Sequence, residues 1–413
     1  MSNQEYYDAL ETRDPTLREQ ELISALGTQL THAKTHSTAY QTLLADIDTD
    51  AVTSRSALAK LPLTRKSELL SLQKQNLPFG GFVADSGNRI EKIFSSPGPI
   101  YEPQFNRKDY WRLARSLFAA GFRAGDLVHN TYSYHLTPAG SMLESAAFAV
   151  GCTVIPAGVG QTEQQVQTIA DLNPNGYVGT PSFLKIILDK AEEQGADLSC
   201  IKRASVSGEP LPEKLRDIFT DRGISVLQTF ATADLGLIGY ESPAKEGLIL
   251  DEQIILEIVR PGSGDPVDEG EVGEIVVTTL NPDYPLIRFA TGDMSAVMPG
   301  YSPCGRTNSR IKGWMGRADQ TTKVRGMFVR PEQVNKVASR FEAIAKFRLT
   351  VSNPDLQDAL LFQCETDDHD DSLKQKIQDV FREVCKVRCE VELVDPKQLP
   401  NDGKVINDSR TFD

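Results

Sequence analysis

Short β-rich runs alternate with amphipathic helical runs through the middle of the chain, from about residue 126 to residue 230. The β-rich runs are LVHNTYSY, CTVIPAG, GYVGT, KRASVSG and SVLQTF, and the helical runs between them are AGSMLESAAFAVG, EQQVQTIADLN, SFLKIILDKAEEQG and EKLRDIFTDRG. Consecutive βα units need crossover connections, so the pattern predicts a largely parallel sheet with helices on its faces. Ligands of such sheets gather at the carboxyl ends of the strands.

The pattern differs on either side of this region. Residues 247–280 contain β-branched runs broken by Gly, Pro and Asp, which are typical of antiparallel hairpins in a separate β subdomain. The first hundred residues read as mostly helical, with Leu22, Ile23 and Leu26 on one helix face.

Beyond residue 319, PEQVNKVASRF, FRLTVSN, ALLFQCET, DSLKQKIQDVFREV and RCEVELV spell helix, strand, strand, helix and strand. We therefore expect an α/β fold with a large N-terminal domain, residues 1–318, and a small mobile α+β C-terminal domain, residues 319–413. The large domain combines parallel or mixed sheets, helices and the β subdomain.

The charge and the composition of the chain limit the classes of binding partner that we expect. The 413 residues include 44 Lys plus Arg and 57 Asp plus Glu, for a formal charge of −13. This charge opposes attraction to nucleic acid or an anionic membrane, and no apolar run approaches the roughly 20 residues that span a bilayer. The first residues lack the basic cap and apolar run of a secretory signal, so we expect a cytoplasmic protein with free thiols. The six cysteines include no CxxC pair.

The segment GRADQTTKVRG, residues 316–326, is the most specific motif in the chain. It resembles the GRxDxxxKxRG hinge motif of the adenylate-forming enzymes at every fixed position. The resemblance implies that Arg317 holds the nucleotide ribose, that Asp319 is the hinge, and that Lys323, Arg325 and Gly326 lie on the coenzyme A side. Two or three of these residues alone would be better explained as a charged, solvated hairpin.

A second segment, RFATGDMSAVMPG, resembles the RxxTRDL segment of the same enzymes. Asp293 occupies the position whose carboxylate binds both ribose hydroxyls, because its two oxygens can accept both donors. An ordinary Thr-Gly-Asp turn would be the better explanation of this segment alone, but its spacing ahead of Arg317 favours the ribose site.

From about residue 94 to the C-terminus the chain is similar to the phenylacetate-CoA ligases, a branch of these enzymes. The segments SGEP and TFATAD match the family's GAEP and IYGLSE. The resemblance implies that Asp234 replaces the magnesium-binding glutamate, keeping a hard anionic oxygen ligand on a shorter side chain. The residues it implies around adenine are Ser207, Gly208, Glu209, Phe230 and Ala231.

The segment LPNDGK near the C-terminus matches the family's terminal lysine motif. The resemblance implies that Lys404 is the adenylation lysine. During the attack of a carboxylate on the α-phosphorus of ATP, a mobile ammonium can neutralise charge on both groups. A lysine near a chain end is otherwise most often a solvated surface residue.

The phosphate-binding loop departs from the family. The family reads SSGTTGKP, whereas residues 95–103 read SSPGPIYEP, with three prolines and with Glu102 where the family has a cation. Proline has no N–H and fixes φ, so we expect a stiff loop that binds phosphate poorly. Ser96 and the backbone of Gly98 are the nucleotide-binding groups that remain.

Two further sites follow from the same comparison. Some relatives bind zinc through Cys and His side chains at positions that are here occupied by Ser242, Ile249, Ser302 and Cys304, so we expect no zinc site. The segment YSYHLTPAG resembles the family's acyl-pocket segment YGYG. It offers Tyr132, Tyr134 and His135 as candidate walls for an aryl or other apolar acid, although tyrosines at a strand end serve equally often as ordinary core residues.

The leading hypothesis is an ATP-dependent, AMP-forming acid–CoA ligase that uses Mg²⁺ and coenzyme A on a small carboxylic acid. Homodimerisation is expected by family analogy alone. The main alternative is a paralogue that binds a nucleotide or an acyl-CoA but has lost efficient adenylation, as the altered phosphate loop suggests. A third hypothesis is a ligase that transfers the acyl group to an acceptor such as a free-standing carrier protein.

Overall fold

The computed structural model describes residues 5–96, 99–259, 264–318, 321–354, 357–400 and 405–410. The chain separates into two compact units, one with residues 1–208 and 216–318 and the other with residues 209–215 and 319–413. Within the described residues, no helix has both the length and the apolar character needed to cross a membrane.

The first residues of the larger unit are helical, as predicted. Helix α1 spans Pro15–His36, and Asp14 caps its start by accepting backbone hydrogen bonds from the first turn. Leu22 and Leu26 are buried and Ile23 packs partly buried against the same cluster, so the predicted apolar face is confirmed. The other helical segments here are η1 (Ala9–Thr12), α2 (Thr38–Leu43), η2 (Thr49–Ala51), α3 (Arg55–Leu58) and α4 (Lys66–Gln75).

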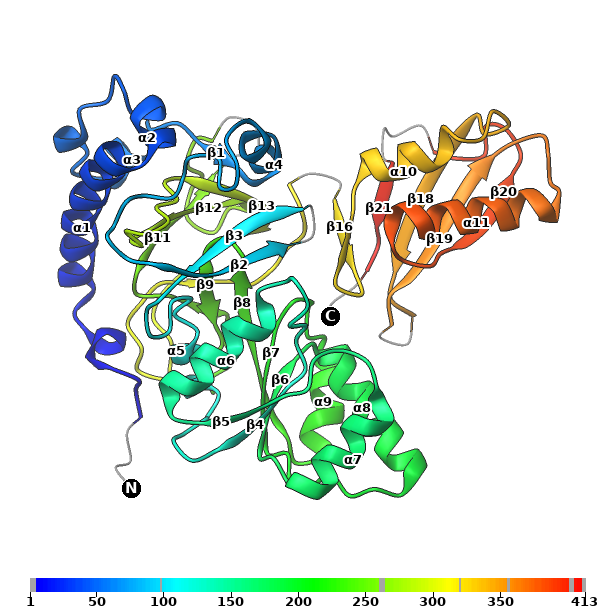
Figure 1. The fold of residues 1–413 in the computed structure, drawn as a ribbon, viewed down its shortest axis with the longest axis horizontal. Coiled ribbons are helices and arrows are strands. Elements are labelled where there is room, and N and C mark those ends of the chain that lie inside the picture. Colours follow the sequence, from blue (N-terminus) through cyan, green and yellow to red (C-terminus); the bar gives the residue numbers. More distant parts are fainter. Residues whose placement is uncertain are drawn as a thin grey trace. The chain divides into compact units, whose positions relative to one another are not determined.

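A nine-stranded sheet forms the centre of the larger unit, with strand order β14-β15-β10-β9-β8-β7-β6-β4-β5. Its parallel part contains β4 (Leu127–Asn130), β5 (Thr153–Pro156), β6 (Gly176–Gly179), β7 (Arg203–Val206) and β8 (Ser225–Thr232). The helices near it are α5 (Ala114–Ala119), α6 (Ala139–Val150), α7 (Thr162–Leu172), α8 (Pro181–Gln194) and α9 (Glu213–Asp221). In Figure 1, α5 and α6 lie on one side of the parallel strands and α7 to α9 on the other, which confirms the predicted βα architecture.

The predicted strand LVHNTYSY is shorter in the structure. Strand β4 ends at Asn130, whose side-chain oxygen accepts a hydrogen bond from the N–H of Tyr132 at 3.1 Å. The chain then turns, with Leu136 at a φ of 64°, before α6 begins.

A second sheet has four strands in the order β1-β13-β12-β11. The antiparallel pairing predicted within residues 247–280 is confirmed for β11 (Ile254–Val259) and β12 (Gly273–Thr279). Strand β13 (Phe289–Ser295) continues the sheet, and β1 (Thr64–Arg65) pairs with it in parallel. Not all of the predicted β subdomain is separate, because β10 (Leu248–Leu250) pairs with β9 and β15 and thus joins the nine-stranded sheet. Its antiparallel neighbours are β9 (Gly236–Tyr240), β14 (Val297–Met298) and β15 (Arg310–Ile311).

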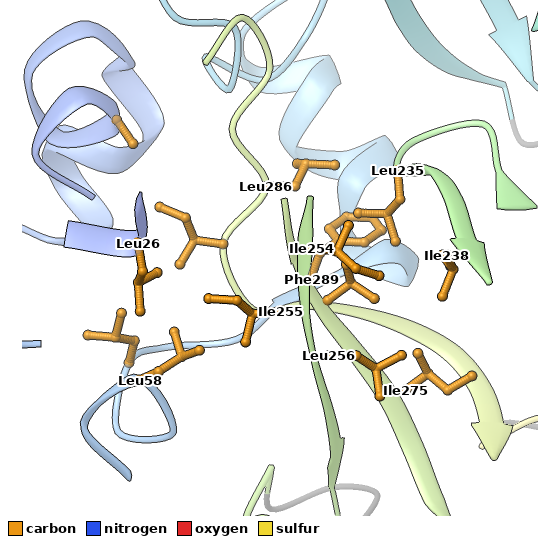
Figure 2. Packing of buried hydrophobic residues seen from close by; sticks show 14 of the residues in the cluster. Leu26, Leu58, Leu235, Ile238, Ile254, Ile255, Leu256, Ile275, Leu286 and Phe289 are labelled. Carbon is orange, nitrogen blue, oxygen red and sulfur yellow. The ribbon is translucent and has the colours of Figure 1, made fainter. Parts of the chain in front are cut away.

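One buried cluster joins the N-terminal helices to these sheets. Figure 2 shows Leu26 and Leu58 from the helical segments facing Ile255 of β11, with Leu256 and Phe289 farther along. Burial of this many aliphatic side chains is the main force that holds the helices on the sheet.

The phosphate-loop segment is a β-hairpin of β2 (Ile90–Ser96) and β3 (Ile100–Phe105). Helix α4 fixes its second strand, because the side-chain amide of Gln73 exchanges two hydrogen bonds of 2.8 Å with the backbone of Tyr101. Gln73 is almost fully buried, so this contact determines how α4 and β3 pack together.

The smaller unit has a four-stranded sheet with the order β20-β19-β18-β21. The predicted succession of helix, strand, strand, helix and strand is confirmed. Ile377 and Phe381 of α11 are fully buried in the core of this unit. The elements are β16 (Thr322–Val324), β17 (Met327–Val329), α10 (Pro331–Ala338), β18 (Lys346–Ser352), β19 (Ala359–Glu365), α11 (Asp371–Cys385), β20 (Glu390–Val394) and β21 (Ile406–Asp408).

Candidate active site

Asp293 and Arg317, the two predicted ribose-binding residues, lie side by side in the larger unit. They face each other in an isolated antiparallel bridge, and the Arg317 guanidinium donates to Asp293 Oδ1 at 2.9 Å. The same guanidinium donates to the Thr291 carbonyl at 3.1 Å. Because β13 ends near Asp293 and the hinge segment runs beside it, the two motifs form one structural feature.

Two further residues, Trp314 and Gly292, belong to this predicted ribose region. The indole Nε1 of Trp314 donates to Asp293 Oδ1 at 3.0 Å, so two donors orient one carboxylate oxygen. Gly292 has a φ of +77°, and a Cβ there would lie 2.4 Å from the guanidinium of Arg317. Gly292 stands where the family motif has Arg, and Arg317 uses the space that a side chain at this position would occupy.

The predicted adenine segment follows β7. Ser207 N–H donates to the Gly179 carbonyl at 3.3 Å, and Gly208 has a φ of +89°, which suits glycine. The Tyr132 hydroxyl lies within hydrogen-bonding distance of the carbonyls of Gly179, at 2.7 Å, and Ser207, at 3.1 Å. The buried Tyr132 therefore supports the predicted adenine segment, and its role as a wall of the acyl pocket stays a prediction. Glu209, the next residue, is grouped with the smaller unit.

The predicted magnesium ligand lies in the turn between β8 and β9. Phe230 and Ala231 are near the end of β8 at an irregularity in the pairing with β9, and both are half-buried. The Thr232 hydroxyl accepts a hydrogen bond from the Leu235 N–H at 3.1 Å and closes the turn around Asp234. Asp234 is 5% exposed, so its carboxylate needs a compensating charge.

That charge is Lys66, the first residue of α4. Lys66 Nζ donates to Asp234 Oδ2 in an ion pair. Burial by itself lowers the pKa of Lys66, but the negative charges of Asp234, Glu102 and Asp293 outweigh it and leave the pKa raised. The Lys66 side chain therefore stays protonated at neutral pH.

Glu102 completes this phosphate-region cluster of Lys66, Glu102 and Asp234. The carboxyl of Glu102 is fully buried and accepts a hydrogen bond from Ser96 Oγ at 3.2 Å. Burial, followed by the negative charge of Asp234, raises the pKa of Glu102 well above its usual range. The negative charge expected at Glu102 is thus opposed by its surroundings. A proton on Glu102 also allows the two carboxyl groups to hydrogen bond to each other.

The carboxylate of Asp234 fits the chemistry of Mg²⁺. Its Oδ1 is buried and accepts no hydrogen bond from an N–H or a hydroxyl group of the described residues. When Glu102 is ionised, this hard anionic oxygen is available to a cation. No group of three or more His, Cys, Asp or Glu side chains in the described part of the chain could hold a metal ion. Nucleotide phosphates would have to supply other ligands.

The remaining acyl-pocket candidates differ in exposure. The Tyr134 hydroxyl accepts a hydrogen bond from Asn130 at 2.8 Å and donates one to Glu144 at 3.0 Å. His135 is exposed, and its N–H donates to Ser133 Oγ at 3.2 Å. Tyr134 is therefore held in place by α6 and β4, whereas His135 lies at the surface of the loop.

In the smaller unit, the predicted coenzyme A residues form the hairpin between β16 and β17. Arg325 and Gly326 occupy its turn with φ values of 48° and 82°, the left-handed geometry that tight hairpins require. Arg325 is tied to Asp358 through its backbone N–H at 3.1 Å and its guanidinium at 2.8 Å. The ammonium of Lys323 lies 5.4 Å from the centre of the Phe328 ring.

Three predicted residues lie outside the described residues. They are Gly98 of the phosphate loop, the hinge residue Asp319 and the adenylation lysine Lys404. Their roles stay predictions.

The positions compared with the zinc ligands of relatives do come together. The Ser302 hydroxyl donates to Cys304 Sγ at 3.1 Å, and Ile249 is buried in the cluster against which Cys304 packs. Burial favours a high pKa for the Cys304 thiol, but hydrogen bonds from Ser242, Ser302 and Arg306 leave that pKa lowered. Hydroxyl and hydrocarbon side chains are poor zinc ligands, and the absence of zinc stays a prediction.

Sequence reasoning missed Lys66, the role of Trp314 and the burial of Glu102. Trp314 stands three residues before Arg317, so its nearness to the motif was a usable signal. Lys66 had no such signal, because its contact with Asp234 depends on the pairing of β1 with β13 and on α4 packing against β3.

Comparison with known proteins defines the class. Residues 109–281 match the family model of the AMP-binding enzymes, and residues 326–410 match that of the AMP-binding enzyme C-terminal domain. The structure superimposes on 2-hydroxyisobutyryl-CoA ligase, in complex with 2-HIB-AMP and CoA, with a TM-score of 0.88 at 21% identity, covering 100% of this chain and 94% of that one. The chain therefore has the fold of an AMP-binding, adenylate-forming enzyme.

Curated relatives define the family. The chain is 31% identical to the phenylacetate-coenzyme A ligase of Aromatoleum evansii over 344 residues, which cover 80% of this chain and 74% of that protein. It is 29% identical to the enzyme of the same name from Thermus thermophilus over 401 residues, covering 87% and 88% of the two chains. This protein belongs to the phenylacetate-CoA ligase family of AMP-forming acid–CoA ligases.

Proposed function

We propose that the protein joins a small carboxylic acid to coenzyme A in two steps that consume ATP. In the first, an acid oxygen attacks the α-phosphorus of ATP, which forms an acyl-adenylate and releases pyrophosphate. In the second, the thiol of coenzyme A attacks the acyl carbon, which forms the thioester and releases AMP. The single observation that carries the proposal is the ribose region, because Asp293 and Arg317 form one hydrogen-bonded unit in a chain of this family.

Each step has residues that we assign to it. The carboxylate of Asp293 accepts hydrogen bonds from the ribose hydroxyls, and Arg317 keeps that carboxylate oriented. Asp234 would hold Mg²⁺, which neutralises the phosphate oxygens when it is bound. Lys404 serves the first step, and a turn of the smaller unit about Asp319 would bring Lys323 and Arg325 to the second.

For the acid we propose a small apolar compound, arylacetic acids included. The support is the family relationship to phenylacetate-CoA ligases and the aromatic residue Tyr134 near the predicted acyl pocket. By analogy with the family, we propose coenzyme A as the acyl acceptor. We propose a homodimer on the same ground.

A second candidate function is nucleotide or acyl-CoA binding without efficient ligation. The observation that favours it is the phosphate loop, in which a buried Glu102 stands where the family has a lysine. Incubation with Mg·ATP, coenzyme A and a panel of aryl, branched and short-chain acids separates the two. We expect AMP and a thioester from at least one acid, whereas AMP binding without either product would support the binding paralogue.

A further inference from the structure

The phosphate loop lacks its lysine, yet the structure places another lysine beside the predicted magnesium ligand. Lys66 comes from α4, outside the loop, and forms an ion pair with Asp234. The side chain of Asp234 is 0% exposed and that of Lys66 is 20% exposed. The carboxylate is thus fully buried, and the lysine side chain beside it is partly exposed.

The fold holds Lys66 in this place from two directions. Strand β1 ends at Arg65, which pairs in parallel with Ala290 of β13, so Lys66 follows directly beside the strand that carries Asp293. On the other side, Gln73 of α4 binds the backbone of Tyr101, the residue before Glu102. The helix therefore connects the ribose region to the phosphate-loop hairpin.

The charges around Lys66 favour a role with an anionic ligand. The ammonium already pairs with one anionic oxygen, Oδ2 of Asp234. Among the described residues, no side chain caps the first turn of α4, so its N–H groups add positive potential at the same end of the helix.

We propose that Lys66 binds the β- and γ-phosphates of Mg·ATP, and the departing pyrophosphate, in place of the lysine that the loop has lost. Before nucleotide binds, the ammonium compensates the buried Asp234 carboxylate. Bound Mg²⁺ would compensate the Asp234 carboxylate in its turn, and the ammonium of Lys66 would then pair with phosphate oxygens. This inference rests on the proposed function, since it needs a protein that binds ATP.

A purely structural ion pair predicts something else. If Lys66 only neutralises Asp234, its loss disturbs the turn between β8 and β9 and weakens every nucleotide alike. If it binds the phosphates, its loss weakens ATP and pyrophosphate while AMP, which lacks the β- and γ-phosphates, binds as before.

Calorimetric titration of Mg·ATP and of AMP into wild type, Lys66→Met and Lys66→Arg distinguishes these roles. Lys74→Met is the matched control, because Lys74 is an exposed lysine on the same helix. We expect Lys66→Met to bind Mg·ATP about tenfold to a hundredfold more weakly, as is typical for a lost hydrogen bond between charged groups. AMP affinity should stay unchanged, Lys66→Arg should recover most of the ATP affinity, and Lys74→Met should match wild type.

Equal weakening of ATP and AMP, or no weakening of either, would overturn the inference while leaving the ligase proposal in place. A wild-type protein that binds neither nucleotide would overturn the proposed function itself. If Lys66→Met does not fold, Lys66→Gln, which keeps a hydrogen bond to Asp234, is compared in the same way.

Discussion

The ribose region and the phosphate region of this enzyme differ in how they are built. In the ribose region, Asp293 and Arg317 belong to recognisable motifs and meet across one backbone bridge. In the phosphate region, the family's loop lysine is missing, and Lys66 and Glu102 reach Asp234 from α4 and β3. If the two regions bind one nucleotide, as we propose, one half of the site keeps its motif while the other half is assembled from different elements.

The largest effect is expected at Lys404, which separates the two half-reactions. Lys404→Ala should slow acyl-adenylate formation by about a hundredfold to a thousandfold, the usual cost of losing a charge-stabilising group in the transition state. Thioester formation from supplied acyl-adenylate should continue, because the lysine acts only in the first step. Single-turnover assays of each half-reaction measure this. The control is Lys397→Ala, at an exposed lysine that shortly precedes Lys404 in the sequence. Equal losses in both steps would argue against a turn about Asp319.

A substitution in the ribose region should weaken the binding of ATP and of AMP equally. Asp293→Ala should weaken ATP and AMP by the same factor, about tenfold to a hundredfold, because both carry the same ribose hydroxyls. Calorimetry on the variant measures this, and Asp268→Ala at an exposed position of the same unit should bind both as wild type does. A loss of affinity for ATP but not for AMP would indicate that Asp293 acts on the phosphates and not on the ribose. The proposed difference between Asp293 and Lys66 would then be wrong.

Gly292 tests the packing inside the ribose region. Gly292→Ala should lower the free energy of unfolding by about 1–3 kcal/mol more than Gly300→Ala, because only the first adds a clash to the backbone strain. Both glycines have a positive φ, +77° and +69°, but only Gly292 has the guanidinium of Arg317 in the way. Denaturant unfolding of the two variants provides the comparison. Equal destabilisation would show that Arg317 moves aside at no cost.

The smallest effect is a change in pH dependence at Glu102. Because its pKa is raised in the folded protein, Glu102 binds a proton more tightly there than in the unfolded chain, so its contribution to stability is lost as the pH rises above about 4.5 through the raised pKa. Glu102→Gln should remove this loss, and its stability relative to wild type should increase with pH. Unfolding measured across pH checks the sign, with Glu91→Gln on the exposed side of β2 as the control. A constant difference at all pH values would mean that folding does not raise the pKa of Glu102.

The sequence predicted the parallel sheet and the small domain well. Their helices and strands bury one face each, so the spacing of residues such as Ile377 and Phe381 identifies the elements directly. The short strands β1 and β10 were harder. Their place depends on distant partners, β13 in one sheet and β9 with β15 in the other, rather than on local pattern.

The candidate site divides in the same way. Motif spacing predicted a shared role for Asp293 and Arg317, and the structure brings the two side chains together. It also predicted Asp234 as a magnesium ligand, from a segment in which aspartate replaces the family's glutamate. It could not identify Lys66, because the ion pair of Lys66 with Asp234 forms only when α4 packs beside β3 and β13. It predicted Tyr132 as a wall of the acyl pocket but gave no sign that the Tyr132 hydroxyl contacts the backbone of Gly179 and Ser207.

The most direct test is the acid-dependent exchange of labelled pyrophosphate into ATP. It tests whether the phosphate region, with its altered loop and with Lys66 beside Asp234, supports adenylation. The exchange requires reversible formation of the acyl-adenylate and needs no coenzyme A, so it isolates the step that the altered loop puts in question. We expect exchange with wild type for at least one small apolar acid, and exchange reduced about tenfold or more in Lys66→Met. Binding of AMP without exchange for any acid would contradict the ligase assignment and support a nucleotide-binding paralogue.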